Sequence, residues 1–134
     1  MEYAMKILIV DDSEFLLKRL VKLVQDLGHE VSPAMSGSEA YRQVQLSIPM
    51  YDVIITDMQM KYGTGLELIE RLYLDSREIP CRLQSSEDYY IKEGKLVNLD
   101  DAVEKYSFAS YAPKDAFGHI EKFLAEVEEK QKSK

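Results

Sequence analysis

The chain has 134 residues, 46% of them hydrophobic and 31% charged, which is enough for one folded domain with its own core. It carries 24 acidic and 17 basic side chains, and the net charge of −7 argues against a protein that binds nucleic-acid backbones. The single cysteine, Cys81, cannot form an intramolecular disulfide, and the first apolar run, Ile7–Val10, is far too short to cross a membrane. We therefore expect a cytoplasmic protein with one domain over residues 1–134, a core over about 5–130 and a charged tail at 131–134.

Short β-branched runs alternate with amphipathic segments along the first half of the chain. Lys6–Val10 and Asp52–Thr56 are short runs rich in β-branched residues and without polar alternation, which is typical of strands buried on both faces of a parallel sheet. His29–Ala34 is a weaker strand candidate, because Pro33 restricts the backbone there. Apolar residues recur at helical spacing between these strands. The expected helices cover residues 14–27, 38–48 and 65–74.

The second half of the chain has a less regular pattern. Cys81–Ser85 and Ser107–Ala112 are predicted strands, and a last helix is expected from about Ala116 to Lys130 with Asp115 as its N-cap. Strands that alternate with helices imply right-handed crossovers, so we expect an α/β fold built on a doubly wound, five-stranded parallel sheet. In such sheets the functional crevice lies at the carboxyl ends of the strands.

Polar side chains stand at these carboxyl ends. Asp11 and Asp12 follow the first strand, Asp57 the third, Ser85 ends the fourth, and Lys114 lies near the end of the fifth. Each has an ordinary explanation by itself; the two neighbouring aspartates, for example, are favourable at the start of a helix. Because the strand ends converge on one edge, we expect three carboxylates, a hydroxyl and an ammonium group in one pocket.

This combination of groups indicates phosphoryl chemistry. Three neighbouring carboxylates raise one another's pKa unless a cation lies between them, and carboxylate oxygens suit Mg²⁺. A carboxylate beside such an ion can act as a nucleophile toward phosphorus. The attack then requires positive charge near the phosphoryl oxygens, which the ion, Lys114 and a serine hydroxyl would supply. We therefore predict a phosphoryl-accepting aspartate with Mg²⁺ as cofactor.

Together with Gly65-Leu66 downstream of Asp57, this residue set resembles the receiver domain of bacterial two-component response regulators, from Lys6 to about Val127. The resemblance implies a flavodoxin-like fold with strand order 2-1-3-4-5. It also implies a chemotaxis-regulator-like signalling protein that takes a phosphoryl group from a histidine kinase or a phosphotransfer protein. Such a domain would promote its own phosphorylation and dephosphorylation without being an independent enzyme.

The resemblance also implies individual roles for the acidic residues. Asp57 would be the phosphoryl acceptor. Asp12, Asp57 and the backbone carbonyl of Gln59 would ligate Mg²⁺, and Asp11 would act through a water molecule.

Further roles follow for residues around this site. Ser85 would contact the phosphoryl group and Lys114 would pair with one of its oxygens, while Tyr111 occupies the position of the family's aromatic switch. Tyr111 could equally be an ordinary core aromatic. Gln59 and Glu87 stand where the family modulates the lifetime of the acyl phosphate, and this pair leads us to expect loss of phosphate over seconds to minutes.

Two departures from the family pattern lie beside the expected site. Lys61 stands where the family usually has proline, so we expect a more mobile loop after Asp57. The family lysine usually precedes a proline, whereas here Pro113 precedes Lys114 and Asp115 follows it. We expect a trans Lys114–Asp115 bond, since a cis bond without proline costs about 2.5–4 kcal/mol. The Lys114 side chain is then expected to approach the pocket differently.

The third departure is the interval between Ser85 and Lys114, which are 29 positions apart and so further apart than in most receivers. The interval contains Gly94 and a short helical candidate at about Leu99–Tyr106, with Asn98 as a possible cap. This composition predicts that the fourth helix of the fold is shortened, displaced or mobile.

The fourth strand supports the same expectation. Cys81–Ser85 alternates apolar and polar residues, which is typical of a strand with one wet face. We therefore expect Arg82 and Gln84 to be partly exposed. The alternative is that both side chains extend along a normal helix that covers them.

Two other functional classes remain to be distinguished. One is a pseudo-receiver, an interaction module that keeps the fold without phosphoryl switching. The other is an enzyme on a similar fold, but a haloacid-dehalogenase-type phosphatase needs a second aspartate where Ser13 stands, and no Gly-rich phosphate loop is present. As partners we expect a kinase or phosphotransfer protein and a downstream protein target, with no nucleic acid and no membrane. We expect a monomer or weak dimer, a stand-alone receiver if the chain is complete and a fragment otherwise.

Overall fold

Five parallel strands form the central sheet, in the order β2-β1-β3-β4-β7. The computed structural model describes residues 4–114 and 118–133, so the expected N-cap at Asp115, the Lys114–Asp115 bond and the expected helix start at Ala116 lie outside it. The strands are β1 Lys6–Val10, β2 Glu30–Ala34, β3 Val53–Asp57, β4 Cys81–Ser85 and β7 Ala109–Pro113. Since β7 is the fifth strand of this sheet in chain order, the predicted fold class and strand order 2-1-3-4-5 are confirmed.

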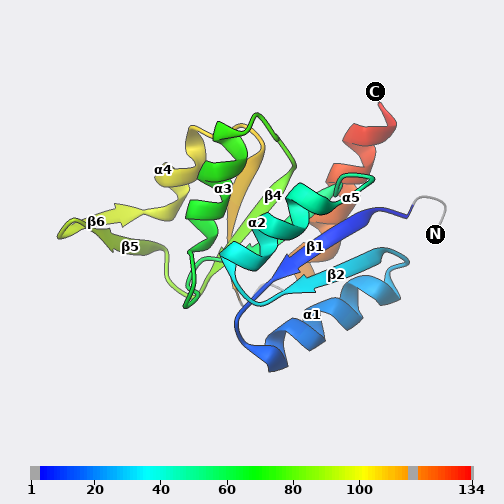
Figure 1. Ribbon diagram of the computed structural model, residues 1–134, viewed down its shortest axis with the longest axis horizontal. Coiled ribbons are helices and arrows are strands. Elements are labelled where there is room, and N and C mark those ends of the chain that lie inside the picture. The colour runs from blue at the N-terminus through cyan, green and yellow to red at the C-terminus, as the bar shows by residue number, and fades with distance from the viewer. Residues whose placement is uncertain (1–3, 115–117, 134) are drawn as a thin grey trace.

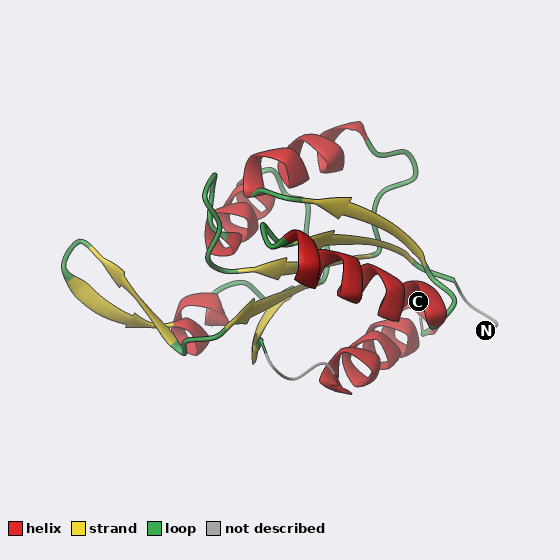
Figure 2. Ribbon diagram, turned by 90° about the horizontal axis from the view of Figure 1, so that it is seen from below, coloured by secondary structure: helices red, strands yellow, loops and turns green. Residues whose placement is uncertain are grey.

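Helices cover both faces of the sheet (Figure 2). Their apolar side chains contribute to two separate cores. Residues of α2 (Gly37–Leu46) and α3 (Gly65–Leu74) belong to one core, and residues of α1 (Glu14–Asp26) and α5 (Gly118–Lys132) belong to the other. Every residue of β3 is buried, which explains why its sequence shows no polar alternation. Apart from the start of α5, which cannot be compared, the observed bounds of these elements differ from the predicted ones by at most two residues.

A β-hairpin follows β4 in the interval where the sequence departs from the family. It consists of β5 (Tyr89–Lys92) and β6 (Lys95–Asn98), which pair antiparallel and project away from the body of the molecule (Figure 1). Both residues of its turn, Glu93 and Gly94, have positive φ angles, 52° and 76°, as a tight hairpin turn requires.

The short helix α4 (Leu99–Glu104) begins directly after the hairpin. Its N-cap is Asn98, whose side-chain oxygen accepts a hydrogen bond from the backbone N–H of Asp101 at 3.2 Å. The expectation of a shortened fourth helix capped by Asn98 is therefore confirmed. The hairpin itself is an addition that the sequence pattern did not reveal.

The expected exposure of Arg82 and Gln84 is wrong: their exposed fractions are 6% and 2%. Both side chains lie on the face of β4 that α5 covers, and the Arg82 guanidinium lies 5.4 Å from the ring centroid of Phe123 in that helix. The short helix α4 packs on the opposite face of the sheet, where its first residue, Leu99, belongs to the same core as residues of α2 and α3. Polar and apolar residues thus alternate in β4 because polar side chains lie beneath a helix, and not because one face of the strand is exposed to solvent.

The described part of the chain contains no helix that is long and apolar enough to cross a membrane.

Candidate functional site

Three carboxylates meet at the carboxyl edge of the sheet. Asp11 and Asp12 follow β1, and Asp57 is the last residue of β3; one carboxylate oxygen from each lies within 4.8 Å of the others. Asp11 and Asp57 are buried, with exposed fractions of 1% and 6%. The start of α1 is capped by Ser13, whose Oγ accepts a hydrogen bond from the Leu16 N–H at 3.3 Å. Capping of α1 therefore does not require either aspartate.

Lys114 brings a positive charge into this cluster. Its Nζ lies 3.0 Å from Oδ2 of Asp57 and 3.4 Å from Oδ2 of Asp11. The backbone N–H of Lys114 donates to the carbonyl of Ser85 at 2.9 Å, which continues the pairing of β4 and β7 to this residue. Pro113 in front of the lysine does not keep its ammonium group out of the pocket.

The buried charges shift the pKa values of the site. Burial raises the pKa of Asp57, the negative charges of Asp11 and Asp12 act in the same direction, and the Lys114 ammonium partly offsets both. Burial acts to lower the pKa of Lys114, but the hydrogen bond and charge of Asp57 together with Asp11 outweigh it, so this pKa is raised. Both shifts reflect an excess of negative charge in a partly desolvated pocket, and such a pocket favours a bound cation.

The loop after β3 is tied to the same cluster. The backbone N–H of Lys61 donates to Oδ2 of Asp12 at 3.2 Å. Gln59 lies in this loop, between Asp57 and Lys61, and its side chain is exposed. Its backbone carbonyl as a metal ligand remains a prediction, as does the greater mobility of the loop around Lys61.

Gly65 allows α3 to begin directly against the end of β3. A Cβ atom at this position would overlap the carbonyl oxygen of Asp57 and lie 2.6 Å from Cδ1 of Leu83. The backbone N–H of Gly65 donates to the carbonyl of Met58 at 3.0 Å, which closes the loop. A glycine is therefore needed here for close packing, a reason that the sequence motif alone does not reveal.

Ser85 lies at the same edge, at the end of β4, and is 2% exposed. Its Oγ accepts a hydrogen bond from the backbone N–H of Glu87 at 3.2 Å. Because the oxygen is the acceptor in this contact, the hydroxyl proton of Ser85 is available for donation.

Tyr111 is held by the segment that leads into the hairpin. Its hydroxyl donates to Oδ1 of Asp88 at 2.6 Å and lies 3.3 Å from the carbonyl oxygen of Glu87. Tyr111 and Glu87 could be identified from the sequence but Asp88 could not, because the spacing of residues does not show which acceptor an aromatic hydroxyl will reach. The hydrogen bond to Asp88 connects β7 with the residue that directly precedes the hairpin.

The donor set fits a hard divalent cation. Carboxylate oxygens are the ligands that Mg²⁺ prefers in proteins, and three of them lie close enough to share one ion. Asp11, Asp12 and Asp57 are thus brought together as the sequence predicted, with Lys114 beside them.

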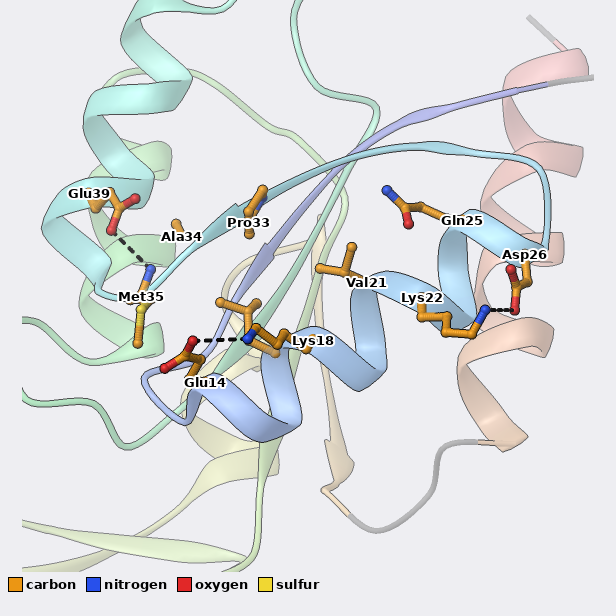
Figure 3. Close-up of a pocket in the computed structure, with 11 residues that line it drawn as sticks. Glu14, Lys18, Val21, Lys22, Gln25, Asp26, Pro33, Ala34, Met35 and Glu39 are labelled. Atoms are coloured by element: carbon orange, nitrogen blue, oxygen red, sulfur yellow. Dashed lines mark hydrogen bonds and ion pairs between the residues drawn. The ribbon is translucent and has the colours of Figure 1, made fainter.

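A groove of about 570 Å³ lies elsewhere, between α1 and β2 (Figure 3). Its rim carries the ion pairs Lys18–Glu14 at 3.1 Å and Lys22–Asp26 at 3.4 Å, both between exposed side chains. Surface pairs of this kind contribute little to stability or chemistry. The candidate site is therefore the carboxyl edge of the sheet and not this groove.

Comparison with known proteins supports the same assignment. The sequence model of the family of response regulator receiver domains matches residues 7–110 of this chain. Chemotaxis protein CheY1 of Helicobacter pylori is 31% identical over 112 residues, which cover 81% of this chain and 88% of CheY1. The gliding motility regulatory protein of Myxococcus xanthus is 43% identical over 68 residues, which cover 51% of this chain but only 8% of that protein.

Solved structures show the same fold. Chemotaxis response regulator CheY4 of Vibrio cholerae has a TM-score of 0.75 and 26% identity, and the match covers 93% of this chain and 99% of CheY4. The Francisella response regulator 1452 receiver domain has a TM-score of 0.79 and 21% identity, with 95% of this chain and 98% of that chain covered. The chain belongs to the family of response regulator receiver domains of two-component systems.

Proposed function

We propose that this receiver domain accepts a phosphoryl group on Asp57 from a histidine kinase or a phosphotransfer protein, and then acts on a protein target. The observation that carries the proposal is the arrangement around Asp57: a buried carboxylate 3.0 Å from the Lys114 ammonium, with Asp11 and Asp12 beside it. Receiver domains are signalling modules, so the modified protein transmits a state and does not turn over a substrate of its own.

In the transfer step, one carboxylate oxygen of Asp57 attacks the phosphorus atom of the donor. An O–P bond forms while the N–P bond of the donor phosphohistidine breaks, and its electron pair stays on the imidazole nitrogen. Lys114 holds positive charge next to the attacking carboxylate of Asp57, where the phosphoryl oxygens need it.

Asp11, Asp12 and Asp57 would hold Mg²⁺, with the backbone carbonyl of Gln59 as a further ligand. When bound, the ion would neutralise charge on the phosphoryl oxygens. The Ser85 hydroxyl would donate a hydrogen bond to a phosphoryl oxygen while its Oγ keeps the hydrogen bond that it accepts from the Glu87 N–H. We assign the lifetime of the acyl phosphate to the side chains of Gln59 and Glu87, and the aromatic switch position to Tyr111.

The test is incubation with acetyl phosphate and Mg²⁺, followed by intact mass measurement. We expect one added phosphate that depends on Mg²⁺ and is absent from Asp57→Asn. As a matched control, Asp52→Asn changes a carboxylate that binds the Lys6 N–H at 2.8 Å in another part of the fold, and this variant should still be modified. Absence of modification in the unaltered protein would instead support the pseudo-receiver, a module that uses the fold for binding alone.

A further inference from the structure

Two polar side chains of β4 are buried without hydrogen-bond partners at some of their donor atoms. Within the described residues, Nε and Nη2 of Arg82 and Nε2 of Gln84 have no acceptor. Both residues are more than nine-tenths buried. A buried donor without an acceptor is unfavourable, and few such atoms occur in a folded protein. Each therefore calls for a reason.

Gln84 lies beside the proposed phosphoryl acceptor. In the parallel pairing of β3 with β4, the Cα partner of Gln84 is Asp57. Neighbouring strands are about 4.8 Å apart, and directly paired residues project from the same face of a sheet. On the other side, Gln84 pairs with Ala112, and Lys114 follows two residues later on the same face. The unpartnered amide of Gln84 thus belongs to the face that carries Asp57 and Lys114.

The unmodified site does not use this amide. The Oδ2 atom of Asp57 accepts from Lys114 at 3.0 Å, and Gln84 makes no hydrogen bond to it. A phosphoryl group on Asp57 would add three strong acceptor oxygens at the strand position that is paired with Gln84. The modification would therefore supply the acceptor that the unmodified protein lacks.

We infer that Gln84 is a further phosphoryl-binding residue of this site: its side-chain amide donates a hydrogen bond to the phosphorylated Asp57, and this bond forms only after modification. The inference rests on the proposed function and deepens it, because it makes part of the stability of the modified state depend on β4. It also explains why a polar side chain follows Leu83 in a strand whose every residue is buried.

Arg82 differs from Gln84 in its surroundings and so provides the matched control. Arg82 pairs with Ile55 of β3, which lies two residues before Asp57 and so further from the site. Its guanidinium lies over the Phe123 ring, and the negative charge of Glu126 in α5 acts on it. A change at Arg82 therefore alters the packing and polarity of the same face of β4 without touching the neighbourhood of Asp57.

The test compares Gln84→Met, which keeps the length of the side chain but removes the donor, with Arg82→Lys, which keeps the positive charge. The probe is beryllofluoride with Mg²⁺, a mimic of the phosphoryl group on a carboxylate, and its affinity is measured by calorimetric titration. We expect about 10-fold weaker binding in Gln84→Met, the effect of losing one hydrogen bond to a charged group. Arg82→Lys should stay within about twofold of the unaltered protein, because its side chain lies outside the site.

A second measurement separates binding from folding. Without beryllofluoride and Mg²⁺, the thermal midpoint of Gln84→Met should be unchanged or higher, since an apolar group of similar shape replaces an unpaired donor. Gln84→Glu, which adds a negative charge instead, should bind beryllofluoride more weakly than Gln84→Met. A structural role would lower the thermal midpoint and leave the affinity unchanged.

The outcomes distinguish the two proposals. If the unaltered protein binds beryllofluoride and Gln84→Met binds it equally well, the inference about Gln84 is overturned while the proposed function stands. Equal losses in Gln84→Met and Arg82→Lys would assign the effect to the packing of β4 and would also overturn it. If the unaltered protein neither binds beryllofluoride nor accepts phosphate, both proposals fail.

Discussion

The carboxyl edge of the sheet and the β5–β6 hairpin are built in opposite ways. At the edge, Asp57 is 6% exposed and follows a strand with every residue buried. In the hairpin, Ile91 and Leu96 face each other across the two strands and are each 67% exposed. Residues on buried parallel strands have little freedom to move, whereas a two-stranded ribbon in water is marginally stable by itself. The candidate site thus lies on the buried part of the fold and not on the exposed hairpin.

The connection between the two regions is narrow. Tyr111 reaches Asp88 from β7, and the backbone N–H of Leu99 donates to the carbonyl of Asp88 at 2.8 Å. Tyr90 is the hairpin residue that packs against the core of α2 and α3. Changes at the tip of the hairpin should therefore leave the site intact, while changes at the sheet edge should affect both stability and ligand binding.

The strongest test of this comparison is Gly65→Ala. The added methyl group would overlap the Asp57 carbonyl oxygen and press on Leu83, so we expect a loss of about 3 kcal/mol in unfolding free energy, the upper end for overpacking. Mg²⁺ affinity should fall with it, because Asp57 must move. Urea denaturation and magnesium titration measure the two effects, and wild-type values in both would contradict the packing argument.

Magnesium itself should stabilise the protein through the carboxyl edge. Binding to the folded state alone raises the unfolding free energy by about 2.7 kcal/mol when the free ion is about 100-fold above its Kd. Asp12→Asn removes one of the three clustered carboxylates and should reduce this gain. Thermal melts with and without millimolar Mg²⁺ provide the measurement, with Asp100→Asn on α4 as the control that should behave like wild type.

His29 lies at the opposite, amino-terminal end of the sheet, directly before β2, and should make the stability of the protein depend on pH. It is buried and its Nδ1 accepts the Met5 N–H at 3.0 Å; burial lowers its pKa below 6.5, although the charges of Glu128 and Asp52 act against this. The unfolded chain then binds a proton more readily than the folded one, so stability is lost as the pH falls through 6.5 toward the folded pKa.

The variant His29→Gln keeps an acceptor for the Met5 N–H but does not titrate. Denaturation curves between pH 7.5 and about 5, above the range where most carboxylates titrate, should show a smaller loss of stability in this variant. An unaltered slope would mean that other groups carry the pH dependence.

The smallest effect is expected at the tip of the hairpin. Gly94 has a φ angle of +76° and nothing within 4 Å of a Cβ built there, so Gly94→Ala meets backbone strain but no steric clash. We expect a cost of about 1 kcal/mol and unchanged Mg²⁺ affinity and phosphorylation. If this variant weakened magnesium binding as much as Gly65→Ala does, the separation of the two regions would be wrong.

Much of the fold could be predicted because burial on both faces leaves a direct trace in a sequence. Lys6–Val10 and the run that forms β3 read as buried strands for this reason, and the polar residues that follow them could be placed at one edge. The hairpin could not be predicted, because its strands are four residues long and its Glu-Gly turn lacks the usual asparagine or aspartate signal. Alternation in β4 showed that one face is polar but did not show what covers it.

The amino-acid sequence was sufficient to predict the strands of the main sheet in chain order and the residues gathered at its carboxyl edge, because strand burial and strand ends are local features of the chain. The tertiary structure was needed to show that α5 covers Arg82 and Gln84, that the Lys114 ammonium pairs with both Asp57 and Asp11, and that a hairpin precedes the short helix α4. These features depend on contacts between segments far apart in the chain. Hydrogen bonding and packing across such distances are settled by the whole fold and not by any one segment.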